Sequence, residues 1–396
     1  MTRSTAFCGW LALSSLALLP GMVSAAPTLP APDPGLLSAL PLPTVQVTLS
    51  RPVYRIRIDR RTGAPVMPRD VIATAAVRNW PAGVPLPTTF LWRVYLDWDS
   101  KVFPTHHSIR NKLFTQPSPL KVNFGEEIRG GTLTVFAKTL LNGKEVWGKA
   151  RALVLGENPP RNIVLQAFPR SRFGLIASKI GMAESGLRQF TEPGGMPVLS
   201  RTNDIGMMQL NAPTGAITSA DQVWDWRANA QRGLEMLRGK HRSVFLASRH
   251  SDGLQRVAED CCDQIAFLNC ARTLLGLPCL SMPSVPPLSD KPGSGKMPGE
   301  PDPDHLNLSQ WEREAVRRYN GGREYAFVIA PDPNTLGILS AGWQVDPTRG
   351  GIRPTSGDPD YVTHVLRARS GLVLTVPSKH KPTKRSRSHH RRHHRR

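Results

Sequence analysis

Long apolar runs are scarce in this chain of 396 residues. The one near the start, Ala6 to Leu19, is too short for a good membrane span, and no later stretch could cross a bilayer. Arg3 precedes this run, and Val23-Ser24-Ala25 after it offers the small residues that a signal peptidase requires. We therefore expect residues 1–25 to be a secretory signal. The mature chain should have no integral membrane segment and should be exported to the periplasm or cell envelope.

Cysteine is also scarce, with five in the chain, of which Cys8 lies in the predicted signal. The others are Cys261, Cys262, Cys270 and Cys279. An even number in an oxidising compartment favours two disulfides, in which each of the adjacent Cys261 and Cys262 pairs with Cys270 or Cys279. Metal binding and free thiols are the alternatives. No histidine stands at zinc-ligand spacing beside these cysteines, so we predict neither a metal site nor a cofactor.

Acidic residues are few, 30 against 51 basic ones, which gives a formal charge of +21. Much of the excess lies in Lys379–Arg396. A run of like charges repels itself and buries no core, so residues 373–396 are expected to form a disordered tail. In an exported protein the tail would attract envelope polyanions, unless it is simply a solvated end. Aromatic residues do not interleave with its charges, so base stacking has no support.

The first half of the mature chain has the alternation of β-strands. Thr88–Trp98 alternates with period two, and Asn142-Gly143 joins two alternating runs, which is a strong hairpin signal. Further strands are predicted at Val45–Leu49 and Val71–Val77. After a proline-rich linker over 26–43, residues 44–156 are therefore expected to form an accessory domain, an immunoglobulin-like sandwich.

Beyond Glu157–Arg161 the periodicity becomes helical, and we predict a mainly α domain over residues 162–372. Residues 241–305 form an insertion within it, with the cysteines first and a Pro/Gly/Ser-rich loop after them. The predicted helices are 172–186, 228–237, 306–319 and 360–368.

Glu184 lies near the C-terminal end of the first of these helices, where the helix dipole disfavours an anion. Apolar neighbours such as Met182 and Leu187 would desolvate the carboxyl. Both effects raise the pKa, as a general acid that works near neutral pH requires. Taken alone, Glu184 fits an ordinary surface glutamate better.

Two strings downstream of Glu184 favour a catalytic role for it. Gly206-Met207-Met208-Gln209 offers a tight turn and an amide that can bond a sugar. Tyr319-Asn320-Gly321-Gly322 offers a phenol that could orient the Glu184 carboxyl, and an amide for substrate.

In this order, the strings resemble those of the lytic transglycosylase family with the goose-type lysozyme fold, over Arg172 to about Ala368. The resemblance implies a mainly α lysozyme-like domain. With the sandwich predicted from strand alternation, the chain is expected to be multidomain, an N-terminal all-β immunoglobulin-like sandwich followed by that lysozyme-like domain. The resemblance implies that Glu184 is catalytic. The substrate-binding residues that it implies are Ser185, Ser200, Gly206, Met208, Gln209, Tyr319 and Asn320.

The resemblance also implies a reaction on peptidoglycan. Glu184 would protonate the glycosidic oxygen between N-acetylmuramic acid and N-acetylglucosamine, and would then act as base on the muramic C6 hydroxyl, which closes a 1,6-anhydro ring. This route needs one carboxyl group, whereas usual glycosidases need two. Asp204 is the nearest candidate for a second acid, and we interpret it as a surface or turn-capping residue.

Three alternatives stay open at this point. A hydrolytic muramidase would use Asp204 or another acid to activate water. A cell-wall-binding scaffold would lack activity altogether, and a polyanion-binding protein would depend mainly on the tail. The expected partners are glycan strands and, for an enzyme with an accessory domain, a secretion or conjugation machine.

Overall fold

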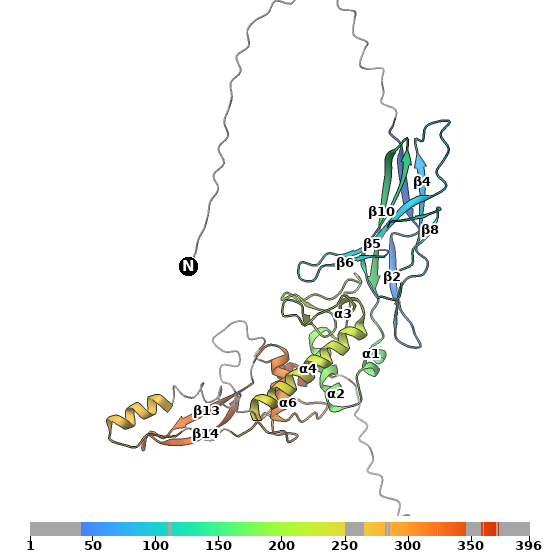
Figure 1. The fold of residues 1–396 in the computed structure, drawn as a ribbon. Helices are drawn as coiled ribbons and strands as arrows, with labels where there is room; N and C mark the ends of the chain where they lie inside the picture. The colour runs from blue at the N-terminus through green and yellow to red at the C-terminus, as the bar shows by residue number, and fades with distance from the viewer. Residues whose placement is uncertain are drawn as a thin grey trace, which may run out of the picture. The chain divides into compact units, whose positions relative to one another are not determined.

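The computed structural model describes residues 41–109, 113–249, 265–281, 283, 286–322, 324–345, 358, 360–369 and 371. The predicted signal and residues 26–40 of the linker lie outside these ranges. Cys261, Cys262 and the predicted tail over 373–396 also lie outside them. The chain divides into two compact units, Met1–Leu42 and Pro43–Arg396, and the second contains the strands and helices that follow (Figure 1).

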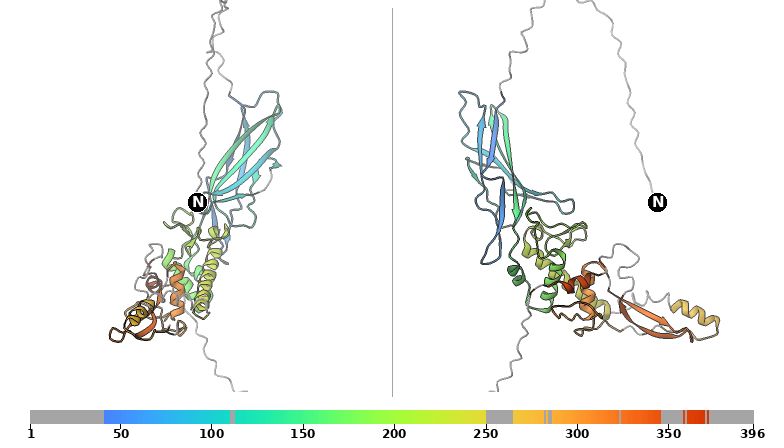
Figure 2. Two further views of the ribbon diagram at one scale, coloured as in Figure 1. Left: turned by 60° about the vertical axis from the view of Figure 1, so that its left-hand side comes forward. Right: turned by 180° about the vertical axis from the view of Figure 1, so that it is seen from behind.

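A seven-stranded sheet dominates the first part of this unit. Its order is β3-β2-β10-β9-β5-β6, and β7 pairs with β5 beside that path. β2 is parallel to β10, and the other pairs are antiparallel. The long strands curl along their length (Figure 2). The strands are β2 (Val53–Ile58), β3 (Pro65–Val66), β5 (Phe90–Trp98), β6 (Thr105–Ser108), β7 (Phe114–Gln116), β9 (Gly131–Leu141) and β10 (Lys144–Gly156).

A smaller sheet of β1 (Thr44–Leu49), β4 (Ile72–Arg78) and β8 (Leu120–Lys121) has the order β1-β4-β8. β1 approaches β10 so closely that a Cβ on Gly148 would lie 1.8 Å from the Val45 carbonyl oxygen, so only glycine fits there. The alternation predicted in β5 is confirmed, with Trp92 wholly buried. The predicted hairpin is confirmed too: β9 and β10 meet at Asn142-Gly143, both with positive φ.

Helices and two strand pairs, β11-β12 and β13-β14, follow these sheets in the described part of the unit. The helices are α1 (Arg161–Ala167), α2 (Arg172–Ser185), α3 (Asp221–Trp224), α4 (Trp226–Arg249), α6 (Gln310–Tyr319) and α7 (Tyr361–Arg367). The strands are β11 (Asp204–Ile205), β12 (Leu210–Asn211), β13 (Tyr325–Pro331) and β14 (Ile338–Val345). The four predicted helices are therefore present, and α4 extends well past residue 237. α4 packs against α2 and α6, and α7 packs against the same two helices.

The predicted fold class is wrong. The chain is mixed, with about 29% strand and 25% helix, and its strands form a curled half-barrel sheet instead of an immunoglobulin-like sandwich. The second part is not a mainly α lysozyme-like domain, because the β13–β14 hairpin belongs to it. Alternation predicts that one face of a strand is buried, but not which partners the strands choose. Tyr325, Phe327 and Ile329 are buried at alternate positions, as period two in a strand requires, in a part for which helices alone are predicted.

Trp224 joins the strands and helices in one hydrophobic core. Its ring centroid lies 5.9 Å from those of Trp98 and Phe190. A Cβ on Gly130 would lie 2.2 Å from the same indole.

Asn158, just after β10, adds polar contacts to this junction. Its Oδ1 accepts the backbone N–H groups of Gln189 and Phe190, both at 2.9 Å, and its Nδ2 donates to the Phe190 carbonyl at 2.8 Å. The loop after α2 is thus held by the end of a strand.

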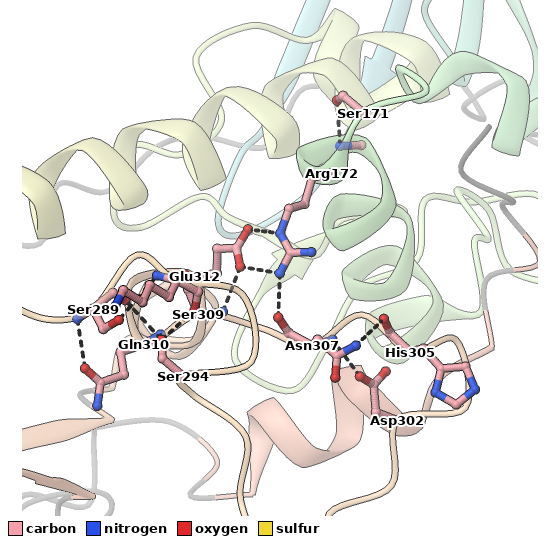
Figure 3. A network of polar contacts seen from close by, with 12 residues as sticks. Ser171, Arg172, Ser289, Ser294, Asp302, His305, Asn307, Ser309, Gln310 and Glu312 are labelled. Carbon is pink, nitrogen blue, oxygen red and sulfur yellow. Dashed lines mark hydrogen bonds and ion pairs between the residues drawn. The ribbon is translucent and has the colours of Figure 1, made fainter. Parts of the chain in front are cut away.

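A polar network ties the start of α2 to the start of α6 (Figure 3). Ser309 and Glu312 form a capping box, in which the serine hydroxyl accepts the Glu312 N–H and the carboxylate accepts the Ser309 N–H at 2.8 Å. Arg172 forms a bidentate pair with Glu312 and donates to the Asn307 carbonyl at 2.7 Å. α2 carries Glu184 and α6 ends at Tyr319, so this network sets the two helices relative to each other.

Candidate active site

Glu184 is the penultimate residue of α2, which ends in a left-handed cap at Gly186 (φ 66°). Burial raises the pKa of its carboxyl to about 7. A hydrogen bond from Tyr361 acts in the opposite direction, while the negative charges of Asp204 and Asp358 raise the pKa further. The rise that the sequence predicted is confirmed, and burial is its main cause.

Tyr361, the first residue of α7, donates its hydroxyl to Glu184 Oε1 at 2.6 Å. Burial and then the nearby Glu184 charge raise the pKa of this phenol well above its usual range, so it remains a neutral donor. Lys179 of α2 fixes the far end of α7, because its Nζ donates to the carbonyls of Leu366 (2.9 Å) and Ala368 (2.6 Å). The geometry of the Glu184–Tyr361 pair therefore comes from α2 and α7 together.

The Gly206–Gln209 turn is held by two buried amides. Gln189 Oε1 accepts the Met207 N–H at 2.9 Å, and Asn229 Oδ1 accepts the Met208 N–H at 2.8 Å. Gly206 has φ 78°, and a Cβ there would lie 2.5 Å from Gln189 Nε2, so the turn requires glycine. Gln189 belongs to no string that the sequence singled out, and only its position in the fold shows its role.

Two predicted substrate-binding residues instead connect α2 and α6 to this turn. Ser185 Oγ donates to the Met207 carbonyl at 2.8 Å, and the Tyr319 hydroxyl donates to the Met208 carbonyl at 2.9 Å. The orienting role that we expected of Tyr319 toward Glu184 was therefore wrong, and Tyr361 fills it. The Gln209 side chain folds back to the Gly206 carbonyl at 2.7 Å.

Asp204 caps the neighbouring turn, as the sequence suggested. One carboxylate oxygen accepts Ser200 Oγ at 2.8 Å and Thr202 Oγ1, and the other accepts Asn211 Nδ2 at 2.6 Å. Ser200 therefore lies at this turn with its hydroxyl engaged. Both oxygens of the candidate second acid, Asp204, therefore accept hydrogen bonds.

Asn320 holds the segment that precedes α7, because its Oδ1 accepts the Asp358 N–H at 2.6 Å. The Asp358 carboxylate receives the Asp360 N–H at 2.9 Å and lies 2.7 Å from His364 Nδ1. The sequence does not predict a role for Asp358, because no spacing relates this residue to Glu184.

Within the described ranges, no group of three or more His, Cys, Asp or Glu side chains is placed to hold a metal ion. In the same ranges, no helix has the length and apolar character to cross a bilayer. Cys270 and Cys279 are exposed and form no disulfide within the described residues, and their predicted partners lie outside the part that the structure describes. The disulfide prediction therefore stays a prediction.

Comparison of the chain with protein-family models, with curated proteins and with solved structures finds no match. What the chain does must therefore be inferred from Glu184 and its neighbours. A carboxyl group with a pKa of about 7, bonded to a neutral phenol, can both give and take a proton near neutral pH.

Proposed function

We propose that this protein is a peptidoglycan lytic transglycosylase with Glu184 as its acid and base. The observation that carries the proposal is the half-buried Glu184 carboxyl with a pKa of about 7, held by the Tyr361 hydroxyl at 2.6 Å. The three strings that resemble the family support it, since Ser185, Met208 and Tyr319 bring them together around one turn.

In the first step, neutral Glu184 gives its proton to the glycosidic oxygen, and the bond from that oxygen to C1 of N-acetylmuramic acid breaks. In the second step, the Glu184 carboxylate takes the proton of the muramic C6 hydroxyl, whose oxygen bonds to C1. The 1,6-anhydro ring closes, and the carboxyl group is again neutral. No water is consumed.

The neighbours of Glu184 suit the two steps differently. Asp204 and Asp358 raise its pKa and so keep it protonated before the first step. The Tyr361 hydrogen bond favours the carboxylate that forms after that step. A pKa near the working pH gives a useful fraction of each form.

The state of the other acids supports ring closure over hydrolysis. A hydrolytic glycosidase needs a second carboxylate that is free to activate water or to attack C1. Both oxygens of Asp204 accept side-chain hydrogen bonds, and Asp358 is occupied by His364 and a backbone N–H. We also propose that the chain acts on glycan strands in the periplasm or cell envelope. Its partner there would be a secretion or conjugation machine that needs a local opening in the wall.

Mass spectrometry of purified sacculi after incubation with the protein tests the reaction. We expect soluble muropeptides with 1,6-anhydro-muramic ends. Reducing muramic ends would identify a hydrolytic muramidase instead. If the protein released no muropeptides at all, the proposed activity would be wrong and a wall-binding scaffold would be favoured.

Tyr361→Phe should lower kcat/KM by about tenfold, because a hydrogen bond to a charged group contributes about 1.5–3 kcal/mol. It should also shift the pH profile. Glu184 must be protonated at the start, so kcat/KM falls as pH rises past about 7. The Tyr361 hydrogen bond lowers the Glu184 pKa, so its removal should move this alkaline limb to higher pH.

The matched control is Tyr319→Phe. It removes a hydroxyl that donates a hydrogen bond to the Met208 carbonyl and not to Glu184. Its alkaline limb should coincide with that of the wild type. A limb that stayed in place in Tyr361→Phe, or moved to lower pH, would contradict the assigned contact.

A further inference from the structure

One side of the seven-stranded sheet carries an ordered set of basic and aromatic side chains. The register places Arg93, Phe136 and Lys149 in one row across β5, β9 and β10. The same register places Tyr95 and Arg151 on either side of Thr134 in the next row. Residues two apart on a strand point to the same side, so these rows and Trp147 share one face. This basic face consists of Arg93, Tyr95, Phe136, Trp147, Lys149 and Arg151.

The basic face is directed away from the core. The alternate residues of the same strands, such as Trp92, Val94 and Val135, are buried inside the half-barrel. Arg93, Lys149 and Arg151 are exposed. Trp147 is 57% exposed, an unusual state for so large an apolar ring.

The positive charge of this face is not neutralised within the described residues. The acids on the same side are already paired, Asp97 with His106 and Glu145 with Lys138. Arg93, Lys149 and Arg151 have no acidic partner in those residues, although Arg93 also lies over the Tyr95 ring at 4.9 Å. The Tyr95 and Phe136 rings meet edge to face at the centre of the face, with centroids 6.1 Å apart.

We propose that the basic face binds the carboxylate-bearing strands of peptidoglycan, with the cations on the carboxylates and Trp147 against a sugar or peptide surface. The choice of this occupant rests on the proposed function. Around Glu184 the neighbouring charges of Asp204 and Asp358 are negative, so they repel an anionic strand. A separate basic surface in the same compact unit would retain such a strand near the site.

Sedimentation with purified sacculi tests this binding. All variants carry Glu184→Gln, so that the sacculi are not digested. The face variant is Arg93→Ala/Lys149→Ala/Arg151→Ala, and Trp147→Ala is tested separately. The control variant, Arg60→Ala/Arg69→Ala/Lys121→Ala, removes the same charge from exposed positions outside the basic face, two in turns between strands and one on β8. Each variant is made in two backgrounds, the full chain and a chain that ends at Ser378. The shorter chain lacks the basic residues Lys379–Arg396, which could bind sacculi by themselves.

The face variant should bind sacculi roughly tenfold more weakly than the control variant, because it loses three exposed cations that pair with carboxylates, each of which contributes modestly. The difference should shrink at high salt and on sacculi whose carboxylates have been amidated. Trp147→Ala should weaken binding at all salt concentrations.

Equal binding by the face and control variants in both backgrounds would overturn the proposal. It would also be overturned if the face variant lost binding to a single-stranded oligonucleotide or to anionic vesicles but kept its binding to sacculi. Muropeptide release by the wild type reports on the reaction alone. A face that binds sacculi in a protein that releases nothing would therefore refute the proposed function and leave this binding site standing.

Discussion

Glu184→Gln is expected to reduce muropeptide release from sacculi by about 10²- to 10⁴-fold, the usual contribution of a positioned general acid or base. The glutamine amide is nearly the same size as the carboxyl. Its oxygen can still accept the hydrogen bond from the Tyr361 hydroxyl, which is 2.6 Å long in the wild type. It can neither give nor take a proton, so both proposed steps fail. Release of soluble products per enzyme, followed by mass spectrometry, measures the loss.

Two further substitutions make this result interpretable. Glu126→Gln removes an exposed carboxylate in the loop between β8 and β9, outside the candidate active site, and should leave release unchanged. Asp204→Asn discriminates between the mechanisms, since ring closure needs no second carboxylate and hydrolysis through Asp204 does. A loss in Asp204→Asn as large as that in Glu184→Gln, with the fold intact, would favour hydrolysis. Full activity in Glu184→Gln would remove the basis of the assignment.

Trp224→Ala is expected to lower the free energy of unfolding by about 3–5 kcal/mol, the usual cost of deleting a buried tryptophan. The indole is wholly buried against Trp98, Phe190 and Gly130, so its removal leaves a cavity where strands and helices meet. Urea denaturation, followed by intrinsic fluorescence and circular dichroism, measures the change.

Trp224→Phe is the matched control. It keeps an aromatic ring and removes an indole N–H that is buried without a hydrogen-bond partner in the described ranges. It should therefore cost clearly less than the alanine. If both variants unfolded at the wild-type urea concentration, Trp224 would not stabilise the junction between strands and helices.

The elements were largely predictable from the sequence, whereas their assembly was not. Period two in Thr88–Trp98 and the Asn142-Gly143 turn are local properties, and both predictions were confirmed. The same local signal occurs in any sheet with one buried face, so it could not tell an immunoglobulin-like sandwich from a curled half-barrel. That choice depends on which strands pair, such as the parallel contact of β2 with β10.

The candidate site was predictable only where residues are close in sequence or form a recognisable string. Glu184 and its raised pKa followed from its position at a helix end among apolar neighbours. Tyr361 lies 177 residues away, and nothing local distinguishes it from Tyr319 as the partner of Glu184. Both phenols are buried close enough to Glu184 for its charge to raise their pKa, and only the packing of α7 on α2 decides which of them donates to it.

The contacts of Asn158 have a consequence for how this chain can be divided or recombined. Asn158 anchors the backbone of Gln189, and the Gln189 side chain in turn holds the Met207 N–H, one residue from the Met208 carbonyl that Tyr319 binds. The end of β10 therefore helps to fix the conformation of the Gly206–Gln209 turn beside Glu184. A fragment that begins after the strands would lose these contacts, so a cut at residues 157–161 would not yield a helical part with the same Gly206–Gln209 turn.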